Sequence, residues 1–113
     1  MEAAIARSKY IRISPRKARL AAGLIRGLPV TLASAQLEYS NLKGGRLLKK
    51  TLDSAIANAE TQLDVRREDL IVKEIRVDQG RVLKRAKPKN RGGRHPILKR
   101  TSHFTIVVST SKE

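Results

Sequence analysis

The sequence predicts an α+β fold in which three helices pack on a small antiparallel sheet and a long β-hairpin projects from this body. Apolar residues recur at helical spacing between residues 46 and 63, and the segments 70–78 and 101–109 are rich in β-branched residues. Gly92-Gly93 lies between those two segments, as expected for the turn of a hairpin. Aromatic residues make up only 3% of the chain, so the core must be built from Leu, Ile, Val and Ala.

The first two elements follow from residues 4–26. Residues 4–13 mix small, β-branched and basic residues, which predicts a strand. Ser14-Pro15 predicts a helix start, with Ser14 as N-cap and Pro15 at the first helical position, and we expect the helix to run to about Arg26 and stop at Gly27. Its apolar residues fill one broad arc: Ala18, Leu20, Ala21, Ala22, Leu24 and Ile25. The basic residues Arg16, Arg19 and Arg26 share the opposite arc with Gly23, so one face suits a core and the other a negatively charged partner.

Two further helices are expected between residues 31 and 63. Thr31 is the predicted cap of a short helix that continues to about Asn41, and Gly44-Gly45 is predicted to break the chain. The third helix is expected from about Arg46 to Leu63. Its apolar residues form a stripe about 100° wide, which is the strongest periodic signal in the chain. The stripe consists of Leu48, Leu52, Ala55, Ile56, Ala59 and Leu63.

The last elements are the strands 70–78 and 101–109, the second with Phe104, Ile106 and Val108 on one face. Counted from Leu70 to Ser109, each side of the hairpin has almost 20 residues, which would span on the order of 60 Å if fully extended. The far end of the hairpin should therefore project beyond the body. No linker or internal repeat divides the chain. We therefore expect a single domain over residues 1–113, with a body at about 1–80 and 100–113 and a basic arm at about 81–100.

The net charge of the chain indicates which class of partner it binds. The formal net charge is +15, from 25 Lys and Arg against 10 Asp and Glu, and such a chain binds polyanions. Nucleic acid is the commonest polyanion. A membrane partner is not expected, because no apolar run approaches the roughly 20 residues that span a bilayer and the basic faces lack Trp or Phe anchors. There is no Cys and no signal-peptide pattern, so we expect no disulfide, no thiolate chemistry and a cytoplasmic location.

The basic arm carries the clearest functional signal. The segment KRAKPKNRGGRHPILKR, residues 84–100, has eight Lys or Arg among seventeen residues, and no acidic residue lies between Asp78 and Glu113. An isolated two-stranded ribbon is only marginally stable in water, and like charges across it are unfavourable. A solvated, disordered charge run would explain the charge but not the strands that flank it. Cations spaced along a ribbon can neutralise successive phosphates, so the arm is interpreted as inserted into folded nucleic acid.

The start of the first helix gives a second basic signal. Acidic residues are favoured in the first turn of a helix, yet Arg16 and Lys17 stand there. A phosphate bound at the cap would turn this unfavourable arrangement into a binding site, whereas ordinary surface charge is the alternative.

Catalytic and metal sites are not expected. Ser102 and His103 are neighbours on a strand and point to opposite faces, so the histidine cannot activate the serine. Asp53 and Glu60 are explained by ion pairs on the surface of the third helix. No set of His, Cys or carboxylate residues suggests a metal ligand cluster, and no phosphate-binding glycine loop is present. We therefore expect no enzyme activity, no cofactor and no small-molecule substrate.

Four motifs resemble the L-twenty-two family of bacterial large-subunit ribosomal proteins. They are SPRKARL at 14–20, SAIANAE at 54–60, VDQG followed by KR at 77–85, and KRTSHFTIVV at 99–108, and the similarity covers nearly the whole chain. The resemblance implies an α+β body on the outside of the large ribosomal subunit and a hairpin that reaches through the ribosomal RNA. It also implies early rRNA binding during assembly, contact with neighbouring large-subunit proteins, and a hairpin tip that lines the exit tunnel near the nascent polypeptide.

The basic side chains and the resemblance together give a set of candidate RNA-binding residues. The set is Lys9, Arg12, Arg16, Lys17, Arg19, Arg26, Lys84, Arg85, Lys87, Lys89, Arg91, Arg94, Lys99, Arg100 and His103. The tunnel-proximal tip implied by the resemblance is Pro88, Lys89, Asn90, Arg91, Gly92, Gly93 and Arg94. Two positions depart from the family pattern: Arg81 stands where a proline is common, and the tip has an extra glycine with a shifted arginine.

One rival function belongs to a different class. An architectural DNA-binding protein with β-arms inserts an apolar wedge into the minor groove, and Pro88 or Pro96 could serve as such a wedge. Those proteins usually act as dimers with a large apolar interface, whereas the predicted core needs only one chain. A stable monomer would therefore count against this alternative.

Overall fold

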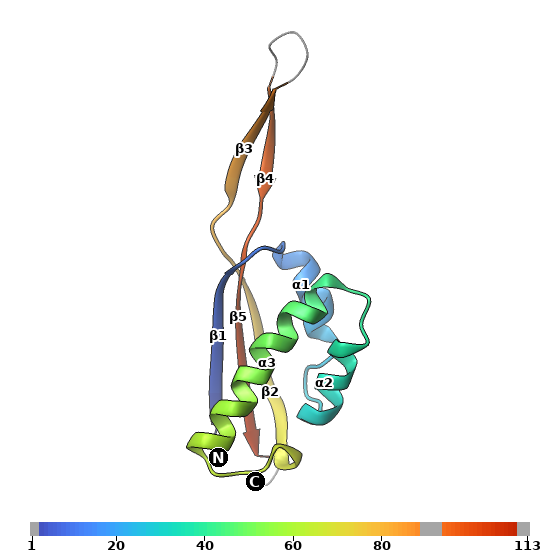
Figure 1. Ribbon diagram of the computed structural model, residues 1–113, viewed down its shortest axis with the longest axis vertical. Helices are drawn as coiled ribbons and strands as arrows, with labels where there is room; N and C mark the ends of the chain where they lie inside the picture. The colour runs from blue at the N-terminus through green and yellow to red at the C-terminus, as the bar shows by residue number, and fades with distance from the viewer. Residues whose placement is uncertain (1–2, 89–93, 111–113) are drawn as a thin grey trace.

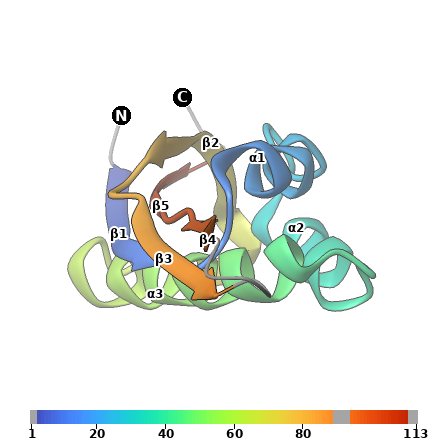
Figure 2. The same ribbon diagram turned by 90° about the horizontal axis from the view of Figure 1, so that it is seen from above.

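The computed structural model describes residues 3–88 and 94–110, with the backbone alone for 83–88 and 94–98. Its sheet has three antiparallel strands, β1 (Ala3–Ile11), β5 (Ser102–Thr110) and β2 (Leu70–Gln79), with β5 in the centre. Helix α3 (Lys43–Gln62) crosses the sheet, and α1 (Pro15–Gly23) and α2 (Val30–Glu38) form a flank away from β1 (Figures 1 and 2). A short 3-10 turn, η1 (Arg67–Asp69), leads into β2. The predicted α+β architecture of three helices on a small antiparallel sheet is confirmed.

The core joins α3 to the sheet as the apolar patterns predicted. Leu48, Leu52 and Ala59 on α3 are fully buried, and so are Phe104 and Ile106 on β5. Phe104 is the largest fully buried side chain among the described residues. Leu63, the last member of the predicted stripe, is only half-buried because α3 ends at Gln62.

The first strand and first helix are shorter than predicted. β1 ends at Ile11 rather than at residue 13, because Ile11 pairs with Ser102, where β5 begins. Tyr10 has a positive φ of 57°, and the register of the ladder shifts between Ser8 and Ile11. The α-helical part of α1 ends at Gly23, and turns lead from there to Gly27. Gly27 has a φ of 81°, which favours glycine, and its N–H donates to the carbonyl of Val72 at 3.0 Å.

The buried arc of α1 is also narrower than predicted. Leu20 and Leu24 were expected in the core, but their side chains are 62% and 45% exposed. The buried residues of α1 are small, and Ile25 in the turns after the helix is also buried, so α1 lies close to its neighbours with only one edge of the predicted arc facing the core. The expectation was wrong because an arc drawn from residue types alone was too broad.

The boundaries of α2 and α3 were mispredicted. Pro29, not Thr31, is the N-cap of α2, and Thr31 is an exposed residue inside that helix. Gly44-Gly45 does not break the chain but lies buried in the first turn of α3. A Cβ on Gly44 would lie 3.3 Å from both Ala21 Cβ and Ile13 Cδ1. Glycine is therefore used here for close packing of α3 against α1, and this contact outweighs its low helix propensity.

The hairpin consists of two ladders instead of one continuous ribbon. β3 (Leu83–Pro88) pairs with β4 (Arg94–Lys99) beyond the end of the β2–β5 ladder, and the molecule reaches 64 Å along its longest axis (Figure 1). Between the ladders, the N–H of Gly80 donates to the carbonyl of Thr101 at 2.9 Å. The buried Thr101 hydroxyl donates to the carbonyl of Arg81 at 2.6 Å. These two bonds tie the base of the arm to the sheet.

Candidate nucleic-acid interface

The start of α1 has the geometry of an anion-binding helix end. Ser14 is the N-cap as predicted, with an extended backbone, and its hydroxyl accepts a hydrogen bond from the N–H of Lys17 at 3.4 Å. Pro15 occupies the first helical position, and the first turn has no acidic residue. The remaining free N–H groups and the positive end of the helix dipole therefore meet no negative side chain in the first turn.

Four separate parts of the chain bring cations together at this helix end. They line a hollow of about 300 Å³, called here the cationic hollow. Its lining includes Lys99, the last residue of β4, and the adjacent Arg100, so it lies where the arm leaves the body. Its lining is Arg12, Ile13, Ser14, Lys17, Lys43, Lys99 and Arg100. Five of these seven residues are Lys or Arg and none is acidic, so the hollow concentrates positive charge that phosphate groups would neutralise.

Lys43 was missed in the sequence analysis, although it belongs to the hollow. Its ammonium donates to the carbonyl of Arg12 at 3.2 Å, across the gap between α3 and the end of β1. Gly44 lets the start of α3 approach α1 closely, which places Lys43 beside the cap. The only sequence signal was the glycine pair that follows Lys43, and that pair was interpreted as a break.

The predicted basic face of α1 divides into two kinds of residue. Arg16 is exposed at the start of the helix. Arg19 donates from Nε and Nη2 to the carbonyl of Val77, at 3.2 and 2.9 Å, and Arg26 Nη2 donates to the carbonyl of Ile75 at 3.0 Å. Arg19 and Arg26 therefore hold α1 against β2, which leaves only part of their donor groups for a ligand.

His103 and Lys9 lie on the sheet below the arm. His103 is half-buried, and its Nδ1 accepts a hydrogen bond from the N–H of Tyr10 at 3.1 Å. The Tyr10 and His103 rings meet edge to face at 4.8 Å between centroids. The buried hydroxyl of Ser102 instead donates to the carbonyl of Ile13 at 2.7 Å, so the serine and the histidine face opposite sides, as predicted. Lys9 is exposed and lines a separate hollow with His103.

The register of the arm avoids the repulsion expected from its charge. Lys84 pairs with Leu98, Arg85 with Ile97, and Lys87 with His95. No Lys or Arg stands directly opposite another in the β3–β4 ladder, so like charges are not paired across it. At the tip, Pro88 pairs with Arg94. The candidate tip residues Lys89, Asn90, Arg91, Gly92 and Gly93 lie outside the described residues.

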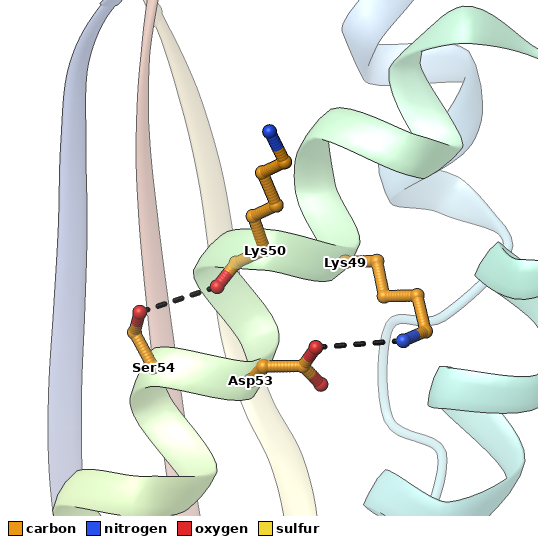
Figure 3. Close-up of polar contacts among 4 residues, drawn as sticks. All are labelled: Lys49, Lys50, Asp53 and Ser54. Carbon is orange, nitrogen blue, oxygen red and sulfur yellow. Dashed lines mark hydrogen bonds and ion pairs between the residues drawn. The ribbon is translucent and has the colours of Figure 1, made fainter.

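The acidic residues of α3 behave as surface charges. The Asp53 carboxylate forms an ion pair with Lys49 one helical turn away, with 3.4 Å between Oδ2 and Nζ (Figure 3). The Lys50 side chain points away from Asp53 (Figure 3). Ser54 donates to the carbonyl of Lys50 at 3.2 Å (Figure 3). The prediction of a helix-surface ion pair is confirmed for Asp53.

The part of the chain that the structure describes has neither a cluster of metal ligands nor a membrane-spanning helix. Over residues 3–88 and 94–110, no three His, Cys, Asp or Glu side chains gather as metal ligands. In the same ranges, no helix is both long enough and apolar enough to cross a membrane.

The fold and the cationic hollow define a class: small basic α+β proteins with a projecting β-arm and a surface suited to nucleic-acid phosphates. Comparison with known proteins gives the family. The model of the family described as ribosomal protein L22p/L17e matches residues 6–109, and the chain belongs to this family.

Curated relatives agree over almost the entire length. The chain is 79% identical over 109 residues to the large ribosomal subunit protein uL22 of Protochlamydia amoebophila, covering 96% of this chain and 98% of that protein. It is 65% identical over 103 residues to the protein of the same name from Chlamydia abortus, covering 91% and 93% of the two chains. The resemblance inferred from SPRKARL and KRTSHFTIVV is thus confirmed.

Proposed function

We propose that this chain is a structural, non-enzymatic constituent of the large ribosomal subunit of cytoplasmic ribosomes. In this role it binds large-subunit rRNA, assists subunit assembly and contacts neighbouring ribosomal proteins. The observation that carries the proposal is the cationic hollow, where five Lys or Arg residues meet at a helix start with no acid in the lining. Family membership and relatives that are named as large-subunit proteins support the same role.

The binding mechanism is electrostatic and steric. RNA phosphates in the cationic hollow would neutralise Lys17, Lys99 and Arg100 and accept hydrogen bonds from the α1 N-terminus. Lys99 and Arg100 sit where the arm joins the body, so the same phosphates would fix the direction of the arm. Cations at intervals along β3 and β4 would then release counterions from successive phosphates.

Assembly and the tunnel form the finer part of the proposal. An arm reaching far beyond the body can contact RNA segments that a compact protein of this size cannot reach together. Binding through the hollow first and the arm second would join these segments as the subunit forms. The arm tip, including Arg91, would line the exit tunnel beside the nascent polypeptide, and this part rests on the family resemblance alone.

A sedimentation experiment tests the role against the DNA-architectural alternative. Ribosomes from cells that make this chain are washed at high salt, separated on a sucrose gradient, and analysed by mass spectrometry. Loosely held basic proteins leave at high salt because each phosphate contact adds to the salt dependence. The proposal expects one copy per large subunit after the wash. Release to the top of the gradient, or migration with the nucleoid, would favour the DNA-binding alternative.

A further inference from the structure

A second group of polar side chains lies on the face of the sheet opposite to α3. Helix α3 packs on one face of the sheet (Figure 2), and the alternation along β5 turns Phe104 toward the core and His103 to the other face. A hollow of about 380 Å³ beside His103 is called here the sheet-face hollow. Its lining is Arg7, Lys9, Asp78, His103, Phe104 and Thr105. Unlike the cationic hollow, it combines cations with a carboxylate.

A β-bulge places Tyr10 against His103 beside this hollow. The register of the β1–β5 ladder shifts there, so that Lys9 and Tyr10 together stand opposite His103. Tyr10 has a φ of 57°, in the left-handed region that bulky side chains rarely adopt. Bulges change the direction of side chains, and residues held in such conformations cluster at functional sites. The bulge therefore indicates a function for Tyr10 beyond its place in the ladder.

The Tyr10 ring keeps a free face for a planar ligand. Tyr10 is 59% exposed, and its ring meets the His103 ring edge to face, at 4.8 Å between centroids. In this geometry one ring presents its edge and the other a single face, so His103 covers at most one face of Tyr10. Unstacked RNA bases bind to exposed aromatic faces of this kind.

The groups around Tyr10 match the parts of a nucleotide. His103 Nδ1 accepts the Tyr10 N–H, so a neutral His103 ring carries its proton on Nε2, where it can donate to a base. Asp78 stands opposite His103 in the β2–β5 ladder, and its carboxylate can accept from the amino group of a base. Arg7 and Lys9 are exposed and can neutralise the flanking phosphates. A bare phosphate would be repelled by the carboxylate, whereas a nucleotide uses all of these groups.

The chain connects this group of residues to the cationic hollow. Lys9, directly before Tyr10, lines the sheet-face hollow, and Arg12, two residues after it, lines the cationic hollow. An RNA strand whose phosphates fill the cationic hollow therefore has the Tyr10 ring beside its path.

We propose that Tyr10 and His103 bind an unpaired base of the large-subunit rRNA, with the base stacked on the Tyr10 ring and its edge bonded to His103 and Asp78. This inference rests on the proposed function, because the base belongs to the RNA that the cationic hollow holds. It adds a contact that depends on the base to a binding mode that is otherwise electrostatic.

The test measures binding of the purified full chain to a large-subunit rRNA transcript. Tyr10→Leu removes the ring and should weaken binding at least about fivefold, because stacking of one base contributes that much or more. The slope of log K against log salt should stay unchanged, since loss of the ring releases no counterions. Tyr10→Phe keeps the ring and should retain most of the affinity. The matched control is Tyr39→Leu, because Tyr39 is 82% exposed and lines a hollow with no charged residue.

A fluorescence titration gives a readout that does not depend on how well Tyr10→Leu folds. The chain has two Tyr and no Trp, so the Tyr39→Phe variant emits from Tyr10 alone. This variant is titrated with an oligoadenylate and with an abasic ribose-phosphate chain of the same length. Stacking quenches tyrosine emission, so the oligoadenylate should quench and the abasic chain should not. Equal quenching by the two chains, or none by either, would overturn the inference.

The outcomes separate the inference from the proposed function. If the unmodified chain does not bind the transcript, the proposed function fails and the inference fails with it. If the unmodified chain and Tyr10→Leu bind equally well, the inference is wrong and the RNA-binding role stands. If Tyr10→Phe is as weak as Tyr10→Leu, the hydroxyl and not a stacked ring makes the contact, and the inference is also wrong.

Discussion

Gly80 is predicted to be essential for the geometry of the arm base, and Gly80→Ala tests this. A Cβ at Gly80 would overlap Thr101 Oγ1 and lie 3.1 Å from His103 Cε1. Thr101 is only 2% exposed, and its hydroxyl donates to the carbonyl of Arg81, so it cannot move without losing this bond. Loss of a hydrogen bond costs about 1 kcal/mol, and overpacking adds about 1–3 kcal/mol. We expect Gly80→Ala to lower the free energy of unfolding by about 2–4 kcal/mol.

Urea unfolding followed by circular dichroism measures this cost, and a double-mutant cycle assigns it to the contact. In a Thr101→Ala background the overlapping oxygen is gone, so Gly80→Ala should cost less than about 1 kcal/mol. Gly23→Ala is the control, because no atom lies within 4 Å of its Cβ position. That change should raise the unfolding free energy by about 0.5–1 kcal/mol. The reasoning is refuted if Gly80→Ala costs less than about 0.5 kcal/mol, or costs the same in both backgrounds.

Two other predictions concern the core and the α1 arginines. Phe104→Ala should lower the free energy of unfolding by about 3–5 kcal/mol, because Phe104 is fully buried. Tyr39→Ala, at an exposed position, should change it by less than about 0.5 kcal/mol. Similar free energies of unfolding for the two variants, measured in urea, would contradict the assignment of the core. Arg19→Gln removes the two hydrogen bonds to Val77 and should cost about 1–2 kcal/mol, while Arg16→Gln should leave unfolding unchanged within about 0.5 kcal/mol. If Arg16→Gln proves the more destabilising of the two, the division of the basic face is incorrect.

Periodicity predicted the parts of the fold in which a single pattern decides the structure. The stripe from Leu48 to Ala59 requires burial on one side, and the alternation at Phe104 and Ile106 requires a strand, so both were predictable. Gly44-Gly45 was mispredicted because helix propensity is local, whereas the contact with Ala21 that makes glycine necessary there comes from tertiary packing.

The candidate site was predictable in composition but not in geometry. Arg12, Lys17, Lys99 and Arg100 were all identified as basic candidates, yet nothing in the sequence placed them around one hollow. Their convergence depends on how the arm leaves the sheet. Likewise, the charge of Arg19 was evident from the sequence, while its two bonds to a β2 carbonyl depend on where α1 packs.

The salt dependence of rRNA binding tests the cationic hollow most directly. Binding of the purified protein to a large-subunit rRNA transcript is measured between about 50 and 200 mM salt, and the slope of log K against log salt is compared between variants. The triple variant Lys17→Gln, Lys99→Gln, Arg100→Gln removes three cations from the hollow. The control Arg66→Gln, Arg67→Gln, Lys73→Gln removes the same charge from exposed positions at the start of η1 and in the first half of β2. The start of β2 lies at the end of the sheet away from the arm (Figure 1).

Each phosphate contact contributes about 0.7–0.9 to the slope, so the hollow variant should lose about 2–3 units of slope. The control should lose less than about 0.5, because charges farther than a Debye length from the RNA are screened. A hollow variant whose slope equals that of the control would contradict the account, since it would mean that the converging cations do not contact phosphate.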